Sequence, residues 1–305
     1  MSQGDSERAR PPRRRFYPGR LPMKVLLTND DGIQATGLNA VRRALHELQD
    51  IELAVIAPDS NRSATARSIT TRQPLWVEEV EFEDGSVGHA TDGTPVDCVR
   101  FAALGLLDFQ PELIVSGINH GANLGDDITY SGTVAAALEG IVLGLPAIAV
   151  SQQSPRGELD FRAGDSWQVD HFAQAAAFVA RLVEEIDDVP MPERTLLNVN
   201  CPISAARGVR ACRLGRRIYR DRLELDEEAE GRRRYRIYGD DPSYHHEDGT
   251  DFAAIADGFI AVTPLHFDLT ATDSVDALHG SKLDRLLVPA AREVGTAAEA
   301  DARGG

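Results

Sequence analysis

The chain has little of what marks membrane, disulfide-bonded or zinc-binding proteins. Its 305 residues contain no apolar run near the roughly 18 residues that a membrane helix needs, so we expect no membrane partner. The three cysteines, Cys98, Cys201 and Cys212, form no CxxC pair. Neither a disulfide framework nor a structural zinc site is therefore indicated, and a reducing, cytoplasmic location is expected.

Lysine is also scarce, and acidic residues outnumber basic ones by 48 to 32. Lysine occurs only as Lys24 and Lys282, and the net charge is −16. A protein that binds nucleic-acid polymers gains affinity by neutralising phosphates, so the chain is expected to bind none. A small anionic substrate is compatible with this charge where a local cation or a helix terminus offsets the field.

Composition divides the chain into four segments. Six arginines against two acidic residues give residues 1–22 a net charge of +4, with four prolines and no hydrophobic stretch of a secretory signal. We predict a disordered basic extension there, which is either an inert tail or an electrostatic tether. An α/β catalytic core is expected over 23–202, a hairpin arm with a closing strand and helix over 203–290, and a flexible tail over 291–305.

Strand and helix patterns alternate in the core. Short apolar runs predict buried strands, and apolar residues at helical spacing predict the helices between them. The predicted strands are 23–28, 51–58, 75–82, 113–117, 147–151 and 196–200, and the predicted helices are one through Leu38–Leu48, 94–107, 131–144 and about 167–186. This order predicts an α/β fold with a parallel sheet and helices on both faces.

The pattern changes after Pro202. Two arginine-rich segments, 209–219 and 232–239, flank the acidic stretch 223–231, which predicts a long charged hairpin outside the main sheet. Its charges are either a solvated face or an arm that packs on another subunit. A strand is expected at 259–265 and a helix near 276–286.

Polar loops follow several of the predicted strands. TNDDG (28–32), PDSNRSAT (58–65) and SGINHGANLGDD (116–127) all fall at carboxyl ends, where parallel α/β sheets bind ligands. Asp30 and Asp31 are adjacent carboxylates, and a site that keeps both ionised favours a cation such as Mg²⁺, Mn²⁺ or Ca²⁺. Alternatively, one aspartate caps a helix and the other is solvated. Further oxygen ligands could come from Asn119 and from Ser60 or Ser63.

A second candidate group opens the helix at 131–144. Its free N–H groups suit a phosphate, with Ser131 and Thr133 as hydroxyl donors, although Ser131 could equally be an ordinary N-cap. No GxGxxG follows the first strand, and neither a P-loop lysine nor a GxSxG nucleophile is present. His89 and His120 fall near these loops and either assist the site or are loop residues without a role.

Five segments together resemble the SurE survival-protein family of 5′(3′)-nucleotidases. They are MKVLLTNDDGIQATGL, APDSNRSAT, DGTPVDCV, VSGINHGANLGDDITYSGTVAAALEG and VTPLHFDLT, in consistent order over about 23–270. The resemblance implies a Rossmann-like three-layer parallel-sheet core with a C-terminal β-hairpin arm used in oligomerisation, giving a homodimer or homotetramer. It also implies hydrolysis of nucleoside monophosphates, and in some members of polyphosphate.

The resemblance further assigns roles to residues. One divalent ion per subunit, Mn²⁺ or Mg²⁺, would be held by Asp30, Asp31, Ser63 and Asn119. The substrate phosphate would be bound by Asn123, Ser131, Gly132 and Thr133, and the loop Asp92–Asp97 would lie nearby. Ala122 departs from a proline that many members have.

The implied chemistry is attack by a metal-activated water, with Asp30 or Asp31 as proton acceptor. An aspartyl-phosphate mechanism typically uses carboxylates two residues apart, whereas these are adjacent. The alternative function is a nucleotide-binding regulatory module without turnover. A metal-dependent glycosyltransferase is a third interpretation, which the SGTVAAALEG segment does not support.

Overall fold

The computed structural model describes residues 21–108, 110–155, 167–237, 243–279 and 281. The chain divides into two units, residues 1–267 and 268–305, which are described separately. The predicted tail at 291–305 and nearly all of the predicted basic extension lie outside the described residues. The domain boundaries at 22, 202 and 290 therefore stay predictions.

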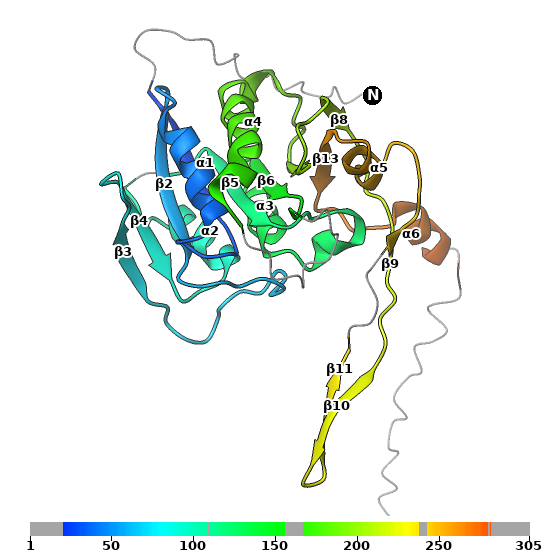
Figure 1. Ribbon diagram of the computed structural model, residues 1–305. Coiled ribbons are helices and arrows are strands. Elements are labelled where there is room, and N and C mark those ends of the chain that lie inside the picture. The colour runs from blue at the N-terminus through cyan, green and yellow to red at the C-terminus, as the bar shows by residue number, and fades with distance from the viewer. Residues whose placement is uncertain (1–20, 109, 156–166, 238–242, 280, 282–305) are drawn as a thin grey trace, which may run out of the picture. The chain divides into compact units, whose positions relative to one another are not determined.

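A mixed sheet of nine strands forms the centre of the first unit, in the order β3-β4-β2-β1-β5-β6-β7-β13-β8. Its strands are β1 (Met23–Thr28), β2 (Ile51–Pro58), β3 (Val77–Glu81), β4 (Val87–Thr91), β5 (Leu113–His120), β6 (Ala147–Gln152), β7 (Thr195–Cys201), β8 (Val209–Ala211) and β13 (Ile260–His266). The six consecutive strands β4, β2, β1, β5, β6 and β7 are parallel to one another, which confirms the predicted α/β fold (Figure 1). Antiparallel pairing occurs at β3 with β4 and at β13 with β7.

Helices cover both faces of this sheet. The α-helices of the first unit are α1 (Thr36–His46), α2 (Pro95–Ala103), α3 (Gly132–Val142), α4 (Ala173–Glu184) and α5 (Asp251–Ala256), and its 3₁₀ turns are η1 (Gly125–Thr129), η2 (Val169–Phe172) and η3 (Ile186–Asp188). The second unit contains the helix α6 (Thr272–His279). Helices α1 and α4 contact each other over one hydrophobic cluster, while α2 and α3 contact each other over a second cluster. The predicted three layers are thus present.

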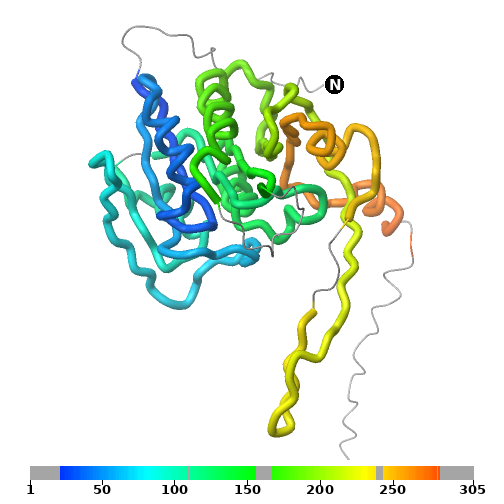
Figure 2. The backbone as a smooth tube through the Cα atoms, viewed as in Figure 1, coloured from blue at the N-terminus to red at the C-terminus, as the bar shows by residue number. Residues whose placement is uncertain are grey.

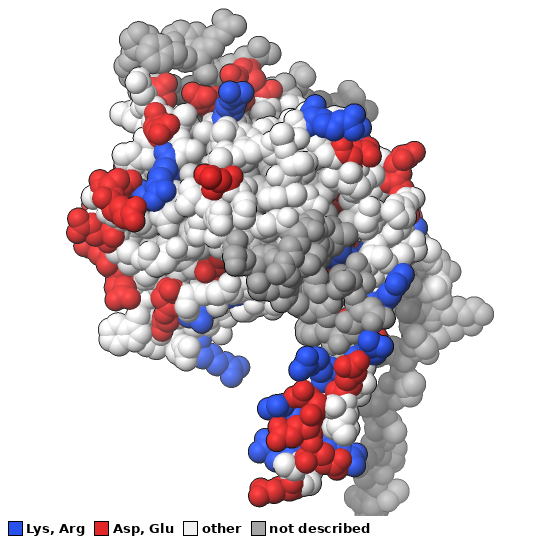
Figure 3. Space-filling model, viewed as in Figure 1, with Lys and Arg blue, Asp and Glu red and all other residues white. Residues whose placement is uncertain are grey.

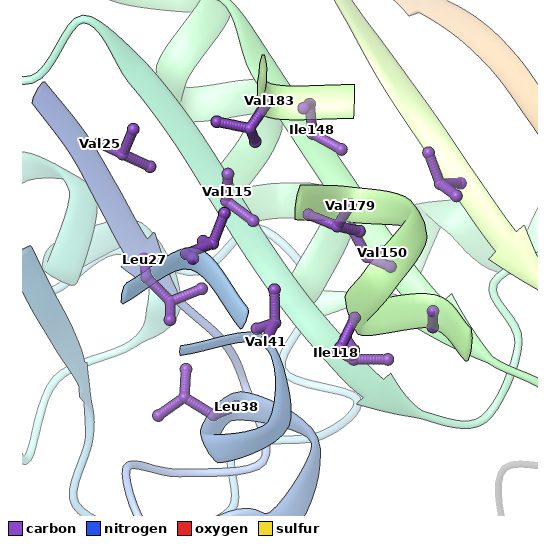
Figure 4. Close-up of a cluster of buried hydrophobic side chains, with 14 of the residues drawn as sticks. Val25, Leu27, Leu38, Val41, Val115, Ile118, Ile148, Val150, Val179 and Val183 are labelled. Carbon is purple, nitrogen blue, oxygen red and sulfur yellow. The ribbon is translucent and has the colours of Figure 1, made fainter. Parts of the chain in front are cut away.

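The larger cluster joins the sheet to α1 and α4. Figure 4 shows Val25, Leu27 and Val115 from the strands facing Leu38 and Val41 of α1. Burial of such apolar side chains is the main favourable term in folding. It fixes the strand ends on which the polar loops are built.

The arm differs from its prediction. The acidic stretch is itself a strand, β10 (Glu224–Ala229), paired antiparallel with β11 (Arg232–Arg236) through a turn at Glu230 and Gly231. Figure 2 shows this hairpin as one continuous loop of chain, and Figure 3 shows both charge signs intermixed along it. Opposite charges on facing strands explain the pairing, because cross-strand ion pairs favour it and like charges oppose it.

The segment predicted as the other arm strand has a different place. Val209–Ala211 joins the edge of the main sheet as β8, and Arg217–Ile218 forms β9, which pairs with β12 (Ser243–Tyr244). The sequence pattern also missed the strand β4 and the short helix α5. Its last helix was expected near 276–286, whereas α6 begins at Thr272, and residues 282–286 lie outside the described residues. None of the described helices is long and apolar enough to cross a membrane, and the three cysteines are free thiols.

Candidate active site

A tight turn after β1 presents the two aspartates. The side chain of Asn29 donates to the carbonyl of Gly32 (3.0 Å) and accepts from its N–H (3.2 Å). Gly32 has a φ of +104°, and a Cβ there would lie 3.1 Å from the backbone of Ser60. Glycine is therefore required where the turn meets the loop after β2.

The Asp30 carboxylate is buried against the start of α3. Thr133 donates both its hydroxyl and its backbone N–H to this carboxylate. A Cβ on Gly132 would lie 2.8 Å from Asp30 Oδ2, so a side chain at 132 would displace the aspartate. Gly132 and Thr133 thus hold Asp30, a positioning role that the sequence analysis did not foresee.

The Asp31 carboxylate is held from two other loops. The backbone N–H of His120 donates to Asp31 Oδ2 (3.0 Å), and Asn61 Nδ2 donates to Oδ1 (3.3 Å). His120 Nδ1 lies 3.8 Å from Asp31 Oδ1, and His120 Nε2 accepts the N–H of Gly37 (3.2 Å). His120 therefore belongs to the site, whereas His89 lies within β4, opposite Ile56 and Glu79.

Both carboxylates resist ionisation in the absence of a cation. Burial, and next to it the charge of Asp31, raises the pKa of Asp30 from 3.8 to about 7, against the lowering effect of Thr133. Burial raises the pKa of Asp31 to about 6. Burial also lowers the pKa of His120 to about 4, so that histidine is neutral at pH 7. The pair is thus a buried acidic site that a cation would stabilise.

The other predicted ligands lie around this pair. Asn119 is the second-last residue of β5 and follows a register irregularity. Its Nδ2 donates to the carbonyl of Gly121 (2.7 Å), which leaves its oxygen as the ligand atom. Ser63 lies on the exposed loop whose Arg62 N–H donates to the Asp30 carbonyl (2.6 Å). Its hydroxyl is exposed there.

This donor set fits a hard divalent cation. Among the described residues no cluster of three or more His, Cys, Asp or Glu side chains exists. The ligands would instead be two carboxylates, one amide oxygen and one hydroxyl, which suit Mg²⁺ or Mn²⁺ and not zinc.

The start of α3 lies beside the carboxylate pair. Ser131 is buried, and its hydroxyl accepts the Val134 N–H (3.1 Å), as an N-cap does. The capping interpretation is therefore confirmed, and the hydroxyl proton stays available for a ligand. An anion at this end would also benefit from the helix dipole.

Asn123 is held by a buried set of polar residues that the sequence pattern missed. Its backbone N–H donates to Asn200 Oδ1 (2.8 Å), and its carbonyl accepts from Asn198 and Asn200 (3.0 Å each). Its Nδ2 donates to Ser151 Oγ (2.8 Å). The alternation of the two asparagines along LLNVN, on one face of β7, was the available signal.

Glu139 of α3 anchors the loop that carries Ser63. Its buried carboxylate accepts from Arg67 of that loop (2.8 Å) and from Arg100 of α2 (2.9 Å). Farther along the same loop, Thr70 donates its N–H and hydroxyl to Asp97 (3.1 and 2.8 Å). A lone glutamate in an alanine-rich helix was the only sequence signal for this anchor.

Comparison with known proteins places these features in context. A family model described as "Survival protein SurE" matches residues 25–221. A relative named "5′-nucleotidase SurE" from Rubrobacter xylanophilus is 50% identical, and the match covers 87% of this chain and 100% of that protein. A relative of the same name from Chloroflexus aggregans is 49% identical, and the match covers 82% of this chain and 95% of that protein. A crystal structure of the SurE protein from Aquifex aeolicus is similar with a TM-score of 0.67 and 34% identity, covering 84% of this chain and 98% of that one.

Proposed function

Because the chain belongs to the SurE survival-protein family, we propose that it is a 5′-nucleotidase, a hydrolase that converts nucleoside monophosphates to nucleoside and phosphate. The observation that carries the proposal is the buried Asp30–Asp31 pair against the first turn of α3. A cation site and an anion site lie side by side there, as hydrolysis of a phosphate monoester requires.

We further propose one Mn²⁺ or Mg²⁺ ion per subunit, held by Asp30, Asp31, Ser63 and Asn119. When bound, such an ion polarises a phosphoryl oxygen and makes a water molecule more acidic. The raised pKa values of the two aspartates support the proposal, since charge neutralisation would offset the cost of their burial. Thr133 and His120 fix the two carboxylates before any ligand arrives.

The residues around the phosphate would act by orientation and charge stabilisation. The Ser131 hydroxyl, the Gly132 N–H and the dipole of α3 would stabilise charge on the phosphoryl oxygens, and Asn123 would hold one of them. The water oxygen forms a bond to phosphorus, the bond to the ester oxygen breaks, and a proton passes to the leaving hydroxyl. Asp30 or Asp31 would accept the proton of the attacking water.

The arm supports a proposal about assembly. Its apolar side chains lie on alternate residues and are all exposed: Leu223 by 66%, Leu225 by 52%, Tyr235 by 44% and Ile237 by 61%. Leu225 and Tyr235 face each other across the hairpin. An isolated two-stranded hairpin is marginally stable at best, so we propose that the arm packs on a second copy of the chain in a homodimer or homotetramer.

A phosphate-release panel tests the proposed activity. The purified chain is incubated with nucleoside 5′- and 3′-monophosphates, polyphosphate and glucose 6-phosphate, each with Mn²⁺, Mg²⁺ or EDTA. We expect release from nucleoside monophosphates with a divalent ion and none in EDTA. Saturable nucleotide binding without release would instead support a regulatory module, and release that EDTA leaves unchanged would contradict the proposed metal dependence.

A further inference from the structure

Three aromatic rings pack together beside the carboxylate pair, and two of them, Trp167 and Phe172, have no part in the chemistry above. The Trp167 ring is stacked with His120 at 5.1 Å between centroids and 26° between planes, and with Phe172 at 5.1 Å and 29°. His120 and Phe172 are themselves 5.0 Å apart. Phe172 is fully buried, whereas Trp167 is half-buried. The three rings thus pack against one another, with Phe172 in the hydrophobic core and His120 and Trp167 partly exposed.

The position of this stack relates it to the substrate. His120 donates its backbone N–H to Asp31, and its ring nitrogen Nδ1 lies 3.8 Å from Asp31 Oδ1. The N–H of Gly37 fixes the opposite side of the imidazole. Trp167 is therefore one ring away from the carboxylates. A nucleoside monophosphate carries its phosphate at one end and its flat base at the other, with the sugar between them.

We propose that Trp167 is a stacking platform for the base of the substrate, and so a specificity-determining residue. This inference rests on the proposed nucleotidase function, because it assumes that the phosphate is bound between the start of α3 and the cation that Asp30 and Asp31 would hold. Stacking accepts any base, since every base has a π face. The platform would favour nucleotides over phosphorylated sugars, and purines over pyrimidines because their stacked area is larger.

Trp76 offers a matched control, because it is the other tryptophan, is 82% exposed and is not part of the stack. We expect Trp167→Leu to raise the KM for AMP roughly ten- to hundredfold, the range of one base–aromatic stack. The kcat/KM for ribose 5-phosphate should stay unchanged. Trp167→Phe should restore most of the affinity for AMP, and Trp76→Leu should leave both substrates unaffected.

Fluorescence gives a readout that does not depend on turnover. The chain has two tryptophans, and Trp76 is 82% exposed, so Trp76→Phe leaves Trp167 as the only tryptophan. Adenosine, a product that is not hydrolysed, should quench this emission in the metal-loaded protein, whereas ribose should not.

Two results would overturn the platform. One is equal loss of kcat/KM for AMP and ribose 5-phosphate in Trp167→Leu, which would mean that the tryptophan only covers the core. The other is an emission that adenosine leaves unchanged. Failure of the proposed function would look different, because the unaltered chain would then release phosphate from neither substrate.

Discussion

Replacing Asp30 with asparagine should stabilise the metal-free protein at alkaline pH. Asp30 is 3% exposed, and burial together with the charge of Asp31 raises its pKa from 3.8 to about 7. At about 1.4 kcal/mol per pH unit, ionising it in the folded protein costs ~4 kcal/mol relative to the unfolded chain. Asparagine does not ionise, and its oxygen can still accept the hydrogen bonds from Thr133.

The sign of the pH dependence follows from linkage. A carboxyl group whose pKa is raised on folding holds its proton more tightly in the folded state. The resulting stability is fully present below pH 3.8 and is lost as the pH rises through about 7. The metal-free wild type should therefore lose stability over this window, and Asp30→Asn should lose less.

Thermal melts in EDTA at pH 5 and pH 8.5 measure the effect. A change of 1 kcal/mol shifts the Tm of a chain of this size by about 2–4 °C, so the variant should melt up to about 8–16 °C above wild type at pH 8.5. At pH 5 about 1.2 pH units of this linkage remain, or roughly 1.7 kcal/mol, so the gap should shrink to about 3–7 °C. Asp97→Asn is the control. Asp97 is also buried, but its carboxylate accepts four hydrogen bonds from Thr70 and Thr94, so this variant should be less stable than wild type at both pH values. An Asp30→Asn variant that melts below wild type at pH 8.5 would refute the reasoning.

Four other changes test separate parts of the site and surface. Ser131→Ala should lower the free energy of unfolding by about 1 kcal/mol, because the Val134 N–H loses its cap. If the hydroxyl also stabilises charge in the transition state, kcat should fall by about 10²-fold. Thermal melts measure the first effect and steady-state kinetics the second. Thr133→Val should raise the pKa of Asp30 further, so the activity profile should move to higher pH, and an unmoved profile would count against that contact. Deleting 224–236 should reduce the oligomer in light scattering, and an unchanged mass would exclude the arm from assembly. Raising the salt concentration from 0.1 to 1 M at constant metal should raise the Tm, because screening weakens the repulsion between like charges in a chain of net charge −16. A flat or falling Tm would mean that the acidic surface reflects composition and is no adaptation to salt.

The central strands and the location of the site could be predicted from the sequence. Runs such as MKVLLT and AIAVS are mostly apolar because both faces of β1 and β6 are covered by helices. The carboxyl-end rule then predicted that Asp30, Asp31 and Asn119 lie together. The same rule placed His120 near the site, but its role stayed open, because its bond to Asp31 depends on a contact between distant segments.

The remaining features depend on contacts between distant segments. Thr133 was expected to hold phosphate, but its hydroxyl points to Asp30, which is 103 residues earlier in the chain. In the sequence, Glu139 looks like an ordinary helix residue, whereas in the structure Arg67 and Arg100 both donate hydrogen bonds to its carboxylate. In the arm, charge complementarity across β10 and β11 decided the pairing, whereas the sequence pattern had treated the acidic stretch as a turn.

Phosphate release from AMP during a Mn²⁺ titration tests the central claim most directly, with wild type and Asp31→Asn compared side by side. If Asp31 is a metal ligand of a phosphomonoesterase, wild type should release phosphate in proportion to bound Mn²⁺. The variant, with its fold intact by circular dichroism, should be orders of magnitude slower at limiting metal. Near-normal release by Asp31→Asn at limiting Mn²⁺ would contradict the assignment of the carboxylate pair.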